Sequence, residues 1–159
     1  MKSISFPRCI IASPASGSGK TVLTMGILRA LQNKGLDVHS YKCGPDYIDP
    51  MFHKRVLGIP CRNLDPYLMG TETVCMEVMN GNDKSDEAQI AVIEGVMGFY
   101  DGIAGTTDNS AYTIARMTDT PVILIISPSG QSITLSAMIK GIQDYEPNSN
   151  ITGVILNRC

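Results

Sequence analysis

The sequence predicts one α/β domain built on a parallel β-sheet with helices on both faces. Short apolar runs alternate along the chain with segments whose apolar residues recur every three or four positions, as strands and helices do in this fold class. Several runs are apolar without interruption, which is typical of strands buried on both sides. With 159 residues, 43% of them hydrophobic and 18% charged, the chain can bury one core.

The first strand and the first helix are predicted on either side of a glycine-rich loop. The N-terminal run MKSISFPRCIIAS lacks a small-residue cleavage site, so we interpret it as leading into a strand, Cys9–Ala12, rather than as a signal peptide. The segment Thr21–Asn33 predicts an amphipathic helix, with Gly35 placed to end it. Its apolar residues follow the spacing of one helix face: Leu23, Ile27, Ala30 and Leu31.

The rest of the chain continues this alternation. Further strands are predicted at Leu36–Cys43, Gln89–Ile93, Pro121–Ile126 and Ile151–Leu156, and the last three are continuous apolar runs. Helical patterns lie at Thr73–Met79, Ser110–Met117 and Ser132–Ile142. In a parallel sheet the residues that directly follow the strands gather at one edge, where ligands bind. Function is therefore expected at these positions.

The segment after the first strand, SPASGSGKT, predicts a phosphate-binding loop. Gly17 and Gly19 allow backbone N–H groups to turn toward an anion, and the helix that follows offers its positive end. Lys20 can reach the β- and γ-phosphates of a nucleotide, and Thr21 can supply a hydroxyl to Mg²⁺. The remaining loop residues of the predicted nucleotide site are Ser16 and Ser18. The alternative is a turn rich in glycine and serine with a chance Gly-Lys-Thr.

Pro14 departs from the pattern G-x-x-x-x-G-K-[ST], because it stands where that pattern has its first glycine. That glycine mainly eases entry into the loop, whereas the phosphate cradle lies further along the chain. We therefore expect nucleotide binding to persist.

Two carboxylates follow the second predicted strand, in KCGPDYIDPMFHKR. Asp46 and Asp49 stand beside glycine and proline residues that predict a rigid turn. Lys42, Lys54 and Arg55 add positive charge around them. Carboxylates near a nucleotide predict Mg²⁺ binding and orientation of a phosphate acceptor, because hard cations take oxygen ligands. The alternative is that both aspartates are turn residues that bond their own backbone.

Further candidates lie at the ends of two later strands. Glu94 ends the apolar run in IAVIEGVMGFYDG, the position of a Walker B acid, and the alternative is a strand-end charge in solvent. Asp101 is another candidate carboxylate, with an ordinary Asp-Gly turn as its alternative. Asn157 is a candidate for contact with a nucleotide base, or a turn former. We interpret His53 as a solvated or anion-facing side chain rather than as a general base.

Four motifs together resemble one family. The stretches ASGSGKT, KCGPDYIDPMFH, NLDPYLM (Asn63–Met69) and IEGVMGFYDG are similar to those of the cobyrinic acid a,c-diamide synthase family, whose close relatives act on hydrogenobyrinic acid or nickel sirohydrochlorin. The resemblance runs from about Cys9 through Arg158. It implies the N-terminal ATP-binding synthetase domain of that family, a P-loop NTPase-like fold of the dethiobiotin synthetase-like type, and ATP and Mg²⁺ as cofactors.

The reaction implied by the resemblance is ATP-dependent amidation of the a and c carboxylates of a tetrapyrrole acid in cobalamin biosynthesis. ATP phosphorylates a carboxylate, and ammonia then displaces phosphate from the acyl phosphate. Such chemistry needs positioned ATP and charge neutralisation rather than a protein nucleophile. The resemblance also implies a role for each candidate residue. Lys20 and Thr21 would bind the phosphates, and the metal would be held by Thr21, Asp46 and Glu94. Asp49 and Asp101 would orient the substrate or stabilise intermediates, and Asn157 would contact the adenine.

Family members also carry a C-terminal glutaminase domain that supplies the ammonia, whereas this chain stops at Cys159. We therefore expect residues 1–159 to form part of the synthetase domain, in a truncated or isolated piece without the glutaminase domain. Cys159 is not expected to be the glutaminase nucleophile, because no nucleophile-elbow loop or helix follows it. A homodimer is one expected assembly.

Composition narrows the partners and the location. A net charge of -2 and the absence of a long Lys/Arg run argue against nucleic acid and membrane surfaces as partners. No apolar run approaches the ~20 residues needed to span a bilayer. The five cysteines are odd in number and form no C-x-x-C pair, so we expect reduced thiols in a cytoplasmic protein.

Three other functions stay open. A nucleotide switch of the chromosome-partition or septum-site ATPase type shares the fold, but such proteins usually place a second lysine near the front of the loop, where this chain has Ala15. A dethiobiotin synthetase-like ligase is the nearest alternative among ligases, although GPDYIDP and EGVMGFYDG resemble the corrinoid branch more closely. The third is an inert fragment that binds nucleotide or tetrapyrrole without turnover.

Overall fold

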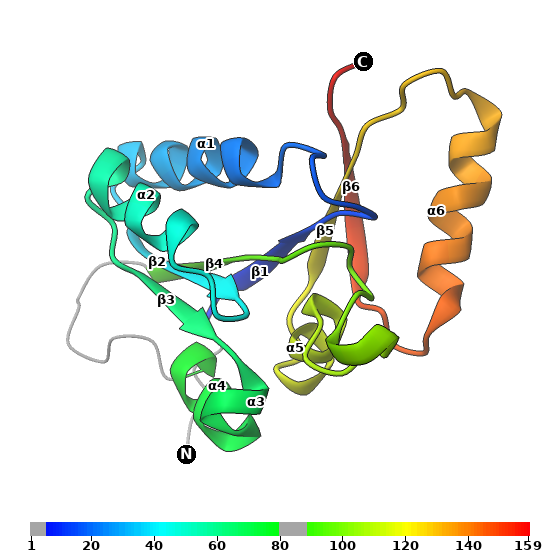
Figure 1. Cartoon of the computed structure of the whole chain (residues 1–159). Coiled ribbons are helices and arrows are strands. Elements are labelled where there is room, and N and C mark those ends of the chain that lie inside the picture. Colours follow the sequence, from blue (N-terminus) through cyan, green and yellow to red (C-terminus); the bar gives the residue numbers. More distant parts are fainter. Residues whose placement is uncertain (1–5, 80–88) are drawn as a thin grey trace.

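The computed structural model describes residues 6–79 and 89–159, and within them six strands form one sheet (Figure 1). The strands are β1 Arg8–Ala12, β2 Asp37–Cys43, β3 Cys61–Leu64, β4 Gln89–Glu94, β5 Val122–Ile126 and β6 Ile151–Leu156. Their order across the sheet is β3-β2-β4-β1-β5-β6, and all neighbouring pairs are parallel. The predicted parallel sheet is therefore confirmed.

Helices cover both faces of this sheet, as predicted (Figure 1). They are α1 Lys20–Asn33, α2 Ile48–Leu57, α3 Pro66–Met69, α4 Thr71–Met79, α5 Ala111–Met117 and α6 Ile133–Tyr145, with a 3₁₀ turn, η1, at Ile103–Gly105. The helices α1 and α2 lie on one face, and α4 and α5 lie on the other. Within residues 6–79 and 89–159, no helix has the length and apolar character that a membrane span requires.

Adjacent residues of the central strand β1 enter two different cores. Ile11 packs with Leu28 of α1 and Leu57 of α2, whereas Ile10 belongs to the core that contains Val74 of α4. Successive side chains of a strand point to opposite faces, so a strand covered on both faces must be apolar at every position. This arrangement explains the uninterrupted apolar runs of the sequence.

The edge strand β6 differs from the prediction of burial on both faces. Its residues alternate between half-buried and exposed, and Val154 and Leu156 are 37% and 48% exposed. Val154 and Leu156 are the register partners of Leu124 and Ile126 of β5, which belong to the core on the α4 and α5 face, so the exposed residues lie on that face, whereas Ile155 packs against the core beside α1. One face of β6 therefore stays in contact with water.

Four elements were not predicted: α2, β3, α3 and the 3₁₀ turn η1. The helix α2 begins inside the segment that we interpreted as a rigid turn. Pro50 lies in its first turn, where a missing N–H is tolerated. Asp46 Oδ1 accepts hydrogen bonds from the backbone N–H groups of Ile48 and Asp49, at 2.9 and 3.2 Å, and so stabilises the start of the helix. The glycines and prolines of this segment thus precede and open a helix.

The register of the sheet brings three loops together. Glu94, the last residue of β4, pairs with Lys42 of β2 on one side and with Ile11 of β1 on the other. The carboxyl ends of β1, β2 and β4 therefore meet at one edge, where α/β sheets bind their ligands.

Candidate active site

The loop between β1 and α1 has the backbone geometry of a phosphate-binding loop. Gly17 and Gly19 adopt φ angles of 79° and 91°, a region that glycine enters without steric cost. The helix α1 begins directly after them, at Lys20. The first N–H groups of a helix have no partner within it and lie at the positive end of its dipole. They are therefore available to a phosphate.

The front of this loop is attached to the segment that follows β4. The Ser13 carbonyl accepts a hydrogen bond from Phe99 N at 2.8 Å. A Cβ at Gly98 would lie 2.6 Å from the Pro14 carbonyl oxygen, so this close approach requires glycine. Pro14 takes part through its carbonyl, and the N–H that proline lacks is not needed for this contact.

Lys20 is held at the loop by neutral acceptors. Its Nζ donates to Ser13 Oγ and to the Met97 carbonyl, both at 2.8 Å, and its side chain is largely buried. Burial lowers the pKa of Lys20, Lys42 adds to this effect, and Glu94 opposes it. A phosphate oxygen is a stronger acceptor for an ammonium than these neutral groups. The geometry suits the phosphate contact predicted for Lys20.

Glu94 is fully buried, which excludes the alternative of a strand-end charge in solvent. Its Oε1 accepts hydrogen bonds from Thr21 Oγ1 at 2.6 Å and from Lys42 Nζ at 3.0 Å. Its Oε2 lies 3.3 Å from His53 Nε2. Burial opposes ionisation of Glu94, but these partners outweigh burial and lower its pKa. A charged carboxylate is therefore enclosed beside the phosphate loop.

Lys42 lies at the centre of the carboxylates, a more specific place than the general positive charge predicted for it. Its Nζ is 2.6 Å from Asp49 Oδ2, 3.0 Å from Glu94 Oε1 and 3.8 Å from Asp46 Oδ2. Burial lowers the pKa of Lys42, but Glu94 and Asp49 outweigh burial and raise it. A signal was present in the sequence, because a lysine at the end of a buried strand requires an acidic partner.

The two aspartates that follow β2 have different surroundings. Asp46 uses Oδ1 to stabilise the start of α2, which is the turn role weighed as its alternative. Asp49 Oδ2 contacts Lys42 and lies 3.4 Å from Thr21 Oγ1. Asp49 therefore faces the phosphate loop, whereas one oxygen of Asp46 is engaged by the backbone.

Thr21 and Glu94 are the two predicted metal ligands that the structure brings together, through the 2.6 Å contact of their oxygens. Mg²⁺ commonly takes one or two protein oxygens together with phosphates and water. A hydroxyl and an ionised carboxylate beside a phosphate loop fit that donor set. Among the residues described here, no group of three or more His, Cys, Asp or Glu side chains is placed to hold a metal ion.

Asp101 and Asn157 contact the backbone around the phosphate loop. Asp101 Oδ2 accepts a hydrogen bond from Gly98 N at 2.9 Å and closes the turn after β4. Asn157 Nδ2 donates to the Ser18 carbonyl at 2.9 Å and connects the end of β6 to the loop. Asn157 thus supports the loop backbone directly, a contact that the sequence analysis did not foresee.

The prediction that His53 faces an anion agrees with its 3.3 Å approach to the Glu94 carboxylate, whereas the prediction that His53 is solvated was wrong. Its side chain is fully buried, because it projects from α2, a helix that the sequence analysis did not include. Burial opposes protonation of the ring, but Cys61 and Glu94 outweigh it and raise the pKa of His53 to about 9. His53 is therefore a buried cation beside Glu94.

Residues 9–159 match the family described as the CobQ/CobB/MinD/ParA nucleotide binding domain. The chain belongs to this family. Cobyrinate a,c-diamide synthase of Clostridium acetobutylicum is 45% identical to it over 148 residues, which are 93% of this chain and 33% of that protein. Hydrogenobyrinate a,c-diamide synthase of Streptomyces coelicolor is 44% identical over 153 residues, 96% of this chain and 31% of that protein. The predicted family is therefore confirmed, and the chain spans about a third of the length of these relatives.

Solved structures are similar to this CobQ/CobB/MinD/ParA domain in fold. The signal recognition particle receptor FtsY from Elizabethkingia anophelis has a TM-score of 0.63 at 13% identity, covering 96% of this chain and 52% of FtsY. FlhF, solved in complex with GTP/Mg(2+), has a TM-score of 0.55 at 10% identity, covering 94% of this chain and 55% of FlhF. At identities this low, the similarity concerns the fold alone. The TM-scores confirm the predicted P-loop NTPase-like architecture.

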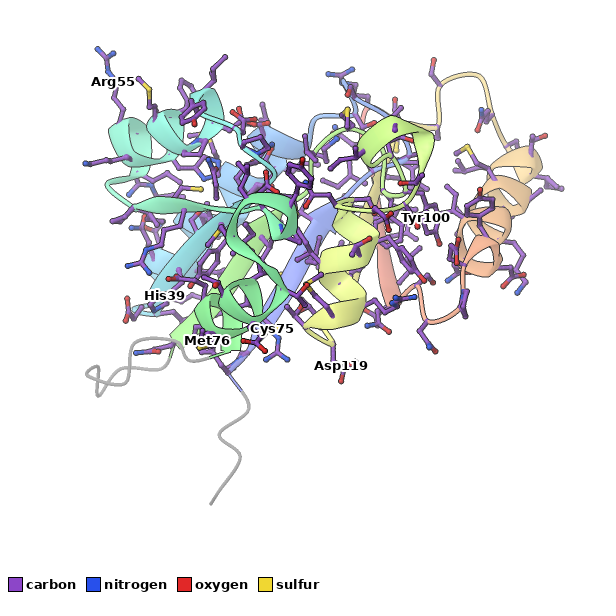
Figure 2. All side chains as sticks on the ribbon, turned by 60° about the horizontal axis from the view of Figure 1, so that its bottom comes forward. His39, Arg55, Cys75, Met76, Tyr100 and Asp119 are labelled. Carbon is purple, nitrogen blue, oxygen red and sulfur yellow. The ribbon has the colours of Figure 1, made fainter. Side chains whose placement is uncertain are left out.

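A cavity of about 620 Å³ lies beside Asp101 in this nucleotide-binding domain, between the segment after β4 and α6. Tyr100 and Tyr145 line it, with ring centroids 5.0 Å apart. Figure 2 shows Tyr100 between α5 and α6, and its hydroxyl donates to the Ile142 carbonyl at 2.6 Å. Aromatic surface therefore lies next to a candidate catalytic carboxylate.

Proposed function

We propose that this chain is the ATP-binding part of an amide ligase that acts on the a and c carboxylates of cobyrinic acid, or of a close tetrapyrrole acid, in cobalamin biosynthesis. The observation that carries the proposal is the placement of Lys20 and Thr21 beside the charged cluster of Lys42, Asp49 and Glu94. One sheet edge thus offers groups for a nucleotide and groups for a charged acceptor. The names of the two relatives support the substrate class.

On the nucleotide side, Lys20 and the N–H groups at the start of α1 would bind the phosphates. Ser16, Gly17, Ser18 and Gly19 form the loop around them. Mg²⁺, held by Thr21 and Glu94, would neutralise charge that develops on the transferred phosphoryl group. Asn157, which already contacts the loop, is proposed to read the adenine.

On the acceptor side, Lys42 holds Asp49 beside the phosphate loop through their 2.6 Å contact. A carboxylate oxygen of the substrate attacks the γ-phosphorus of ATP, and the bond to the ADP oxygen breaks, which leaves an acyl phosphate and ADP. Ammonia then forms the new C–N bond, and inorganic phosphate departs. Asp46, Asp49 and Asp101 are the groups proposed to orient the acceptor and the intermediate.

The ammonia source and the assembly belong to the same proposal. We infer that residues 1–159 are part of the synthetase domain and that a glutaminase domain outside them releases ammonia from glutamine. We also propose that the protein is located in the cytoplasm and forms a homodimer.

Amide formation from cobyrinic acid tests the proposal. With Mg²⁺, ATP and a high concentration of ammonium salt, the chain should form mono- and diamide, together with one ADP and one phosphate per amide. Mass spectrometry of the tetrapyrrole and a phosphate assay measure these products. The assay is run with the chain alone and with the chain fused to the remaining part of the Clostridium acetobutylicum relative.

Two variants serve as matched controls. Lys20→Ala should abolish amide formation, whereas Lys140→Ala should not, because Lys140 lies on the exposed surface of α6 and pairs with Asp144 of the same helix. Cobyrinic, hydrogenobyrinic and nickel-sirohydrochlorin acids are compared in parallel. Hydrolysis of ATP that is equal with and without each acid, with no amide formed by either protein, would reject the ligase function.

A further inference from the structure

His53 makes polar contacts on both sides of its ring inside the protein. It projects from α2 and is fully buried, as is Glu94. Its Nδ1 lies 2.9 Å from Ser40 Oγ, and its Nε2 lies 3.3 Å from Glu94 Oε2. The imidazole thus bridges a hydroxyl of β2 and the carboxylate that ends β4.

The strand register explains how these groups meet. Ser40 and Lys42 are two residues apart on β2 and so point to the same face of the sheet. Lys42 is also the cross-strand partner of Glu94. The helix α2 crosses this part of the sheet and places His53 above both strands.

The two oxygens of Glu94 have different partners. Oε1 accepts hydrogen bonds from Thr21 and Lys42. Within the described residues neither Oε2 nor His53 Nε2 has a hydrogen-bond partner, so the 3.3 Å approach of these two atoms is what compensates the burial of both. A buried carboxylate oxygen without compensation would cost free energy and would favour rotation of the side chain.

We propose that His53 is a positioning residue that holds Oε2 of Glu94 and thereby keeps Oε1 directed at Thr21 and at the divalent cation. This inference rests on the metal site of the proposed function. Ser40 fixes the orientation of the imidazole ring, and the ring fixes the carboxylate. Partners of this kind hold a metal-binding group in place, and their loss typically weakens metal binding.

Binding of ADP with and without Mg²⁺, measured by calorimetry, tests the inference. Wild-type protein should bind ADP more tightly with Mg²⁺ than without it. In His53→Asn, the amide can replace Nδ1 toward Ser40 but does not reach Glu94. This variant should lose roughly 10- to 100-fold of the Mg²⁺-dependent gain, with metal-free ADP affinity unchanged. In His53→Gln, the amide nitrogen can take the place of Nε2, and the gain should be retained.

His39 provides the matched control. It is the other of the two histidines, lies on the same strand as Ser40 and contacts Asp37 rather than Glu94. His39→Asn should keep the full Mg²⁺-dependent gain. An equal gain in His53→Asn and wild type, or equal losses in metal-free and Mg²⁺-bound affinity, would overturn the inference. Absence of amide formation alone would overturn only the ligase function.

A measurement on the wild-type chain remains decisive if His53→Asn does not fold. With ¹⁵N-labelled histidine, two ring systems are observed, and His39→Asn assigns them. Addition of Mg²⁺ to the ADP complex should shift the His53 Nε2 resonance and leave His39 unchanged. A His53 resonance that does not respond to Mg²⁺ would overturn the inference.

Discussion

Lys42 and His53 are buried cations that share one buried carboxylate, Glu94. Removal of one partner from a buried ion pair typically costs about 3–5 kcal/mol, because it leaves the other charge without compensation. The three side chains therefore stabilise one another in addition to any role in the reaction. Their protonation should be visible in the pH dependence of stability.

We predict that the free energy of unfolding falls as pH rises from 6.5 through about 9, because His53 loses its proton in this range. Its pKa is raised from 6.5 to about 9 in the folded chain, so its contribution is complete below pH 6.5 and is lost as pH rises through about 9. Urea unfolding at a series of pH values measures the change. His53→Gln should show a smaller decline over this range, and identical declines would contradict the prediction.

The role of a single residue can be predicted from the sequence where that role depends on its neighbours along the chain. Lys20 and Thr21 follow from one short motif, and Glu94 follows from its place at the end of an apolar strand. The positions of Lys42 and His53 could not be predicted, because they depend on strand register and on how α2 packs across β2. The orientation of Asp46 likewise depends on where α2 begins.

The phosphate loop is an element supported from outside by Asn157. A Cβ at Gly19 would lie 2.5 Å from Asn157 Nδ2, whereas a Cβ at Gly17 would have no atom within 4 Å. Both glycines have positive φ angles. Substitution at Gly17 therefore introduces backbone strain alone, whereas substitution at Gly19 introduces backbone strain and a collision with Asn157.

We predict that Gly19→Ala destabilises the chain more than Gly17→Ala does. Each substitution should cost about 1–3 kcal/mol for the positive φ angle. Gly19→Ala should cost more than this, because Asn157 must move and release the Ser18 carbonyl. Urea unfolding of both variants, with and without Asn157→Ala, measures the coupling between these sites. Equal costs in all backgrounds would show that Asn157 does not support the loop.

The prediction of elements succeeded where the apolar pattern was long and failed where it was short. The boundaries of α1, β4 and β6 lie within one residue of those expected. The strand β3 has only four residues, CRNL, which is too short a segment to show the alternating apolar pattern that predicts a strand. The helix α2 was missed because prolines on both sides of Asp46 and Asp49 resemble a turn, although proline is tolerated in a first helical turn.

At the scale of the whole molecule, the sheet separates two cores, and its β6 edge has one face in water. The alternation of strands and helices was enough to predict this layered arrangement. It was not enough to predict the exposure of Val154 and Leu156, because apolar residues on an edge strand look the same as those on a central strand. Only the position of β6 at the edge of the sheet distinguishes them.

We predict that two leucines of neighbouring strands differ widely in their contribution to stability. Leu124 of β5 is fully buried, and Leu124→Ala should cost about 2–5 kcal/mol. Leu156 of β6 is half exposed, and Leu156→Ala should cost no more than about 1 kcal/mol. Midpoints of urea unfolding compare the two variants. Similar losses would mean that another part of the assembly covers β6 in solution.

The hydrogen bond from Phe99 N to the Ser13 carbonyl connects the two halves of the proposed site mechanically. Ser13 opens the phosphate loop, and Phe99 lies within the turn that Asp101 closes on Gly98. A nucleotide that displaces the loop must therefore also displace this turn. The phosphate loop and the turn beside Asp101 would then shift together, because this backbone contact joins them directly.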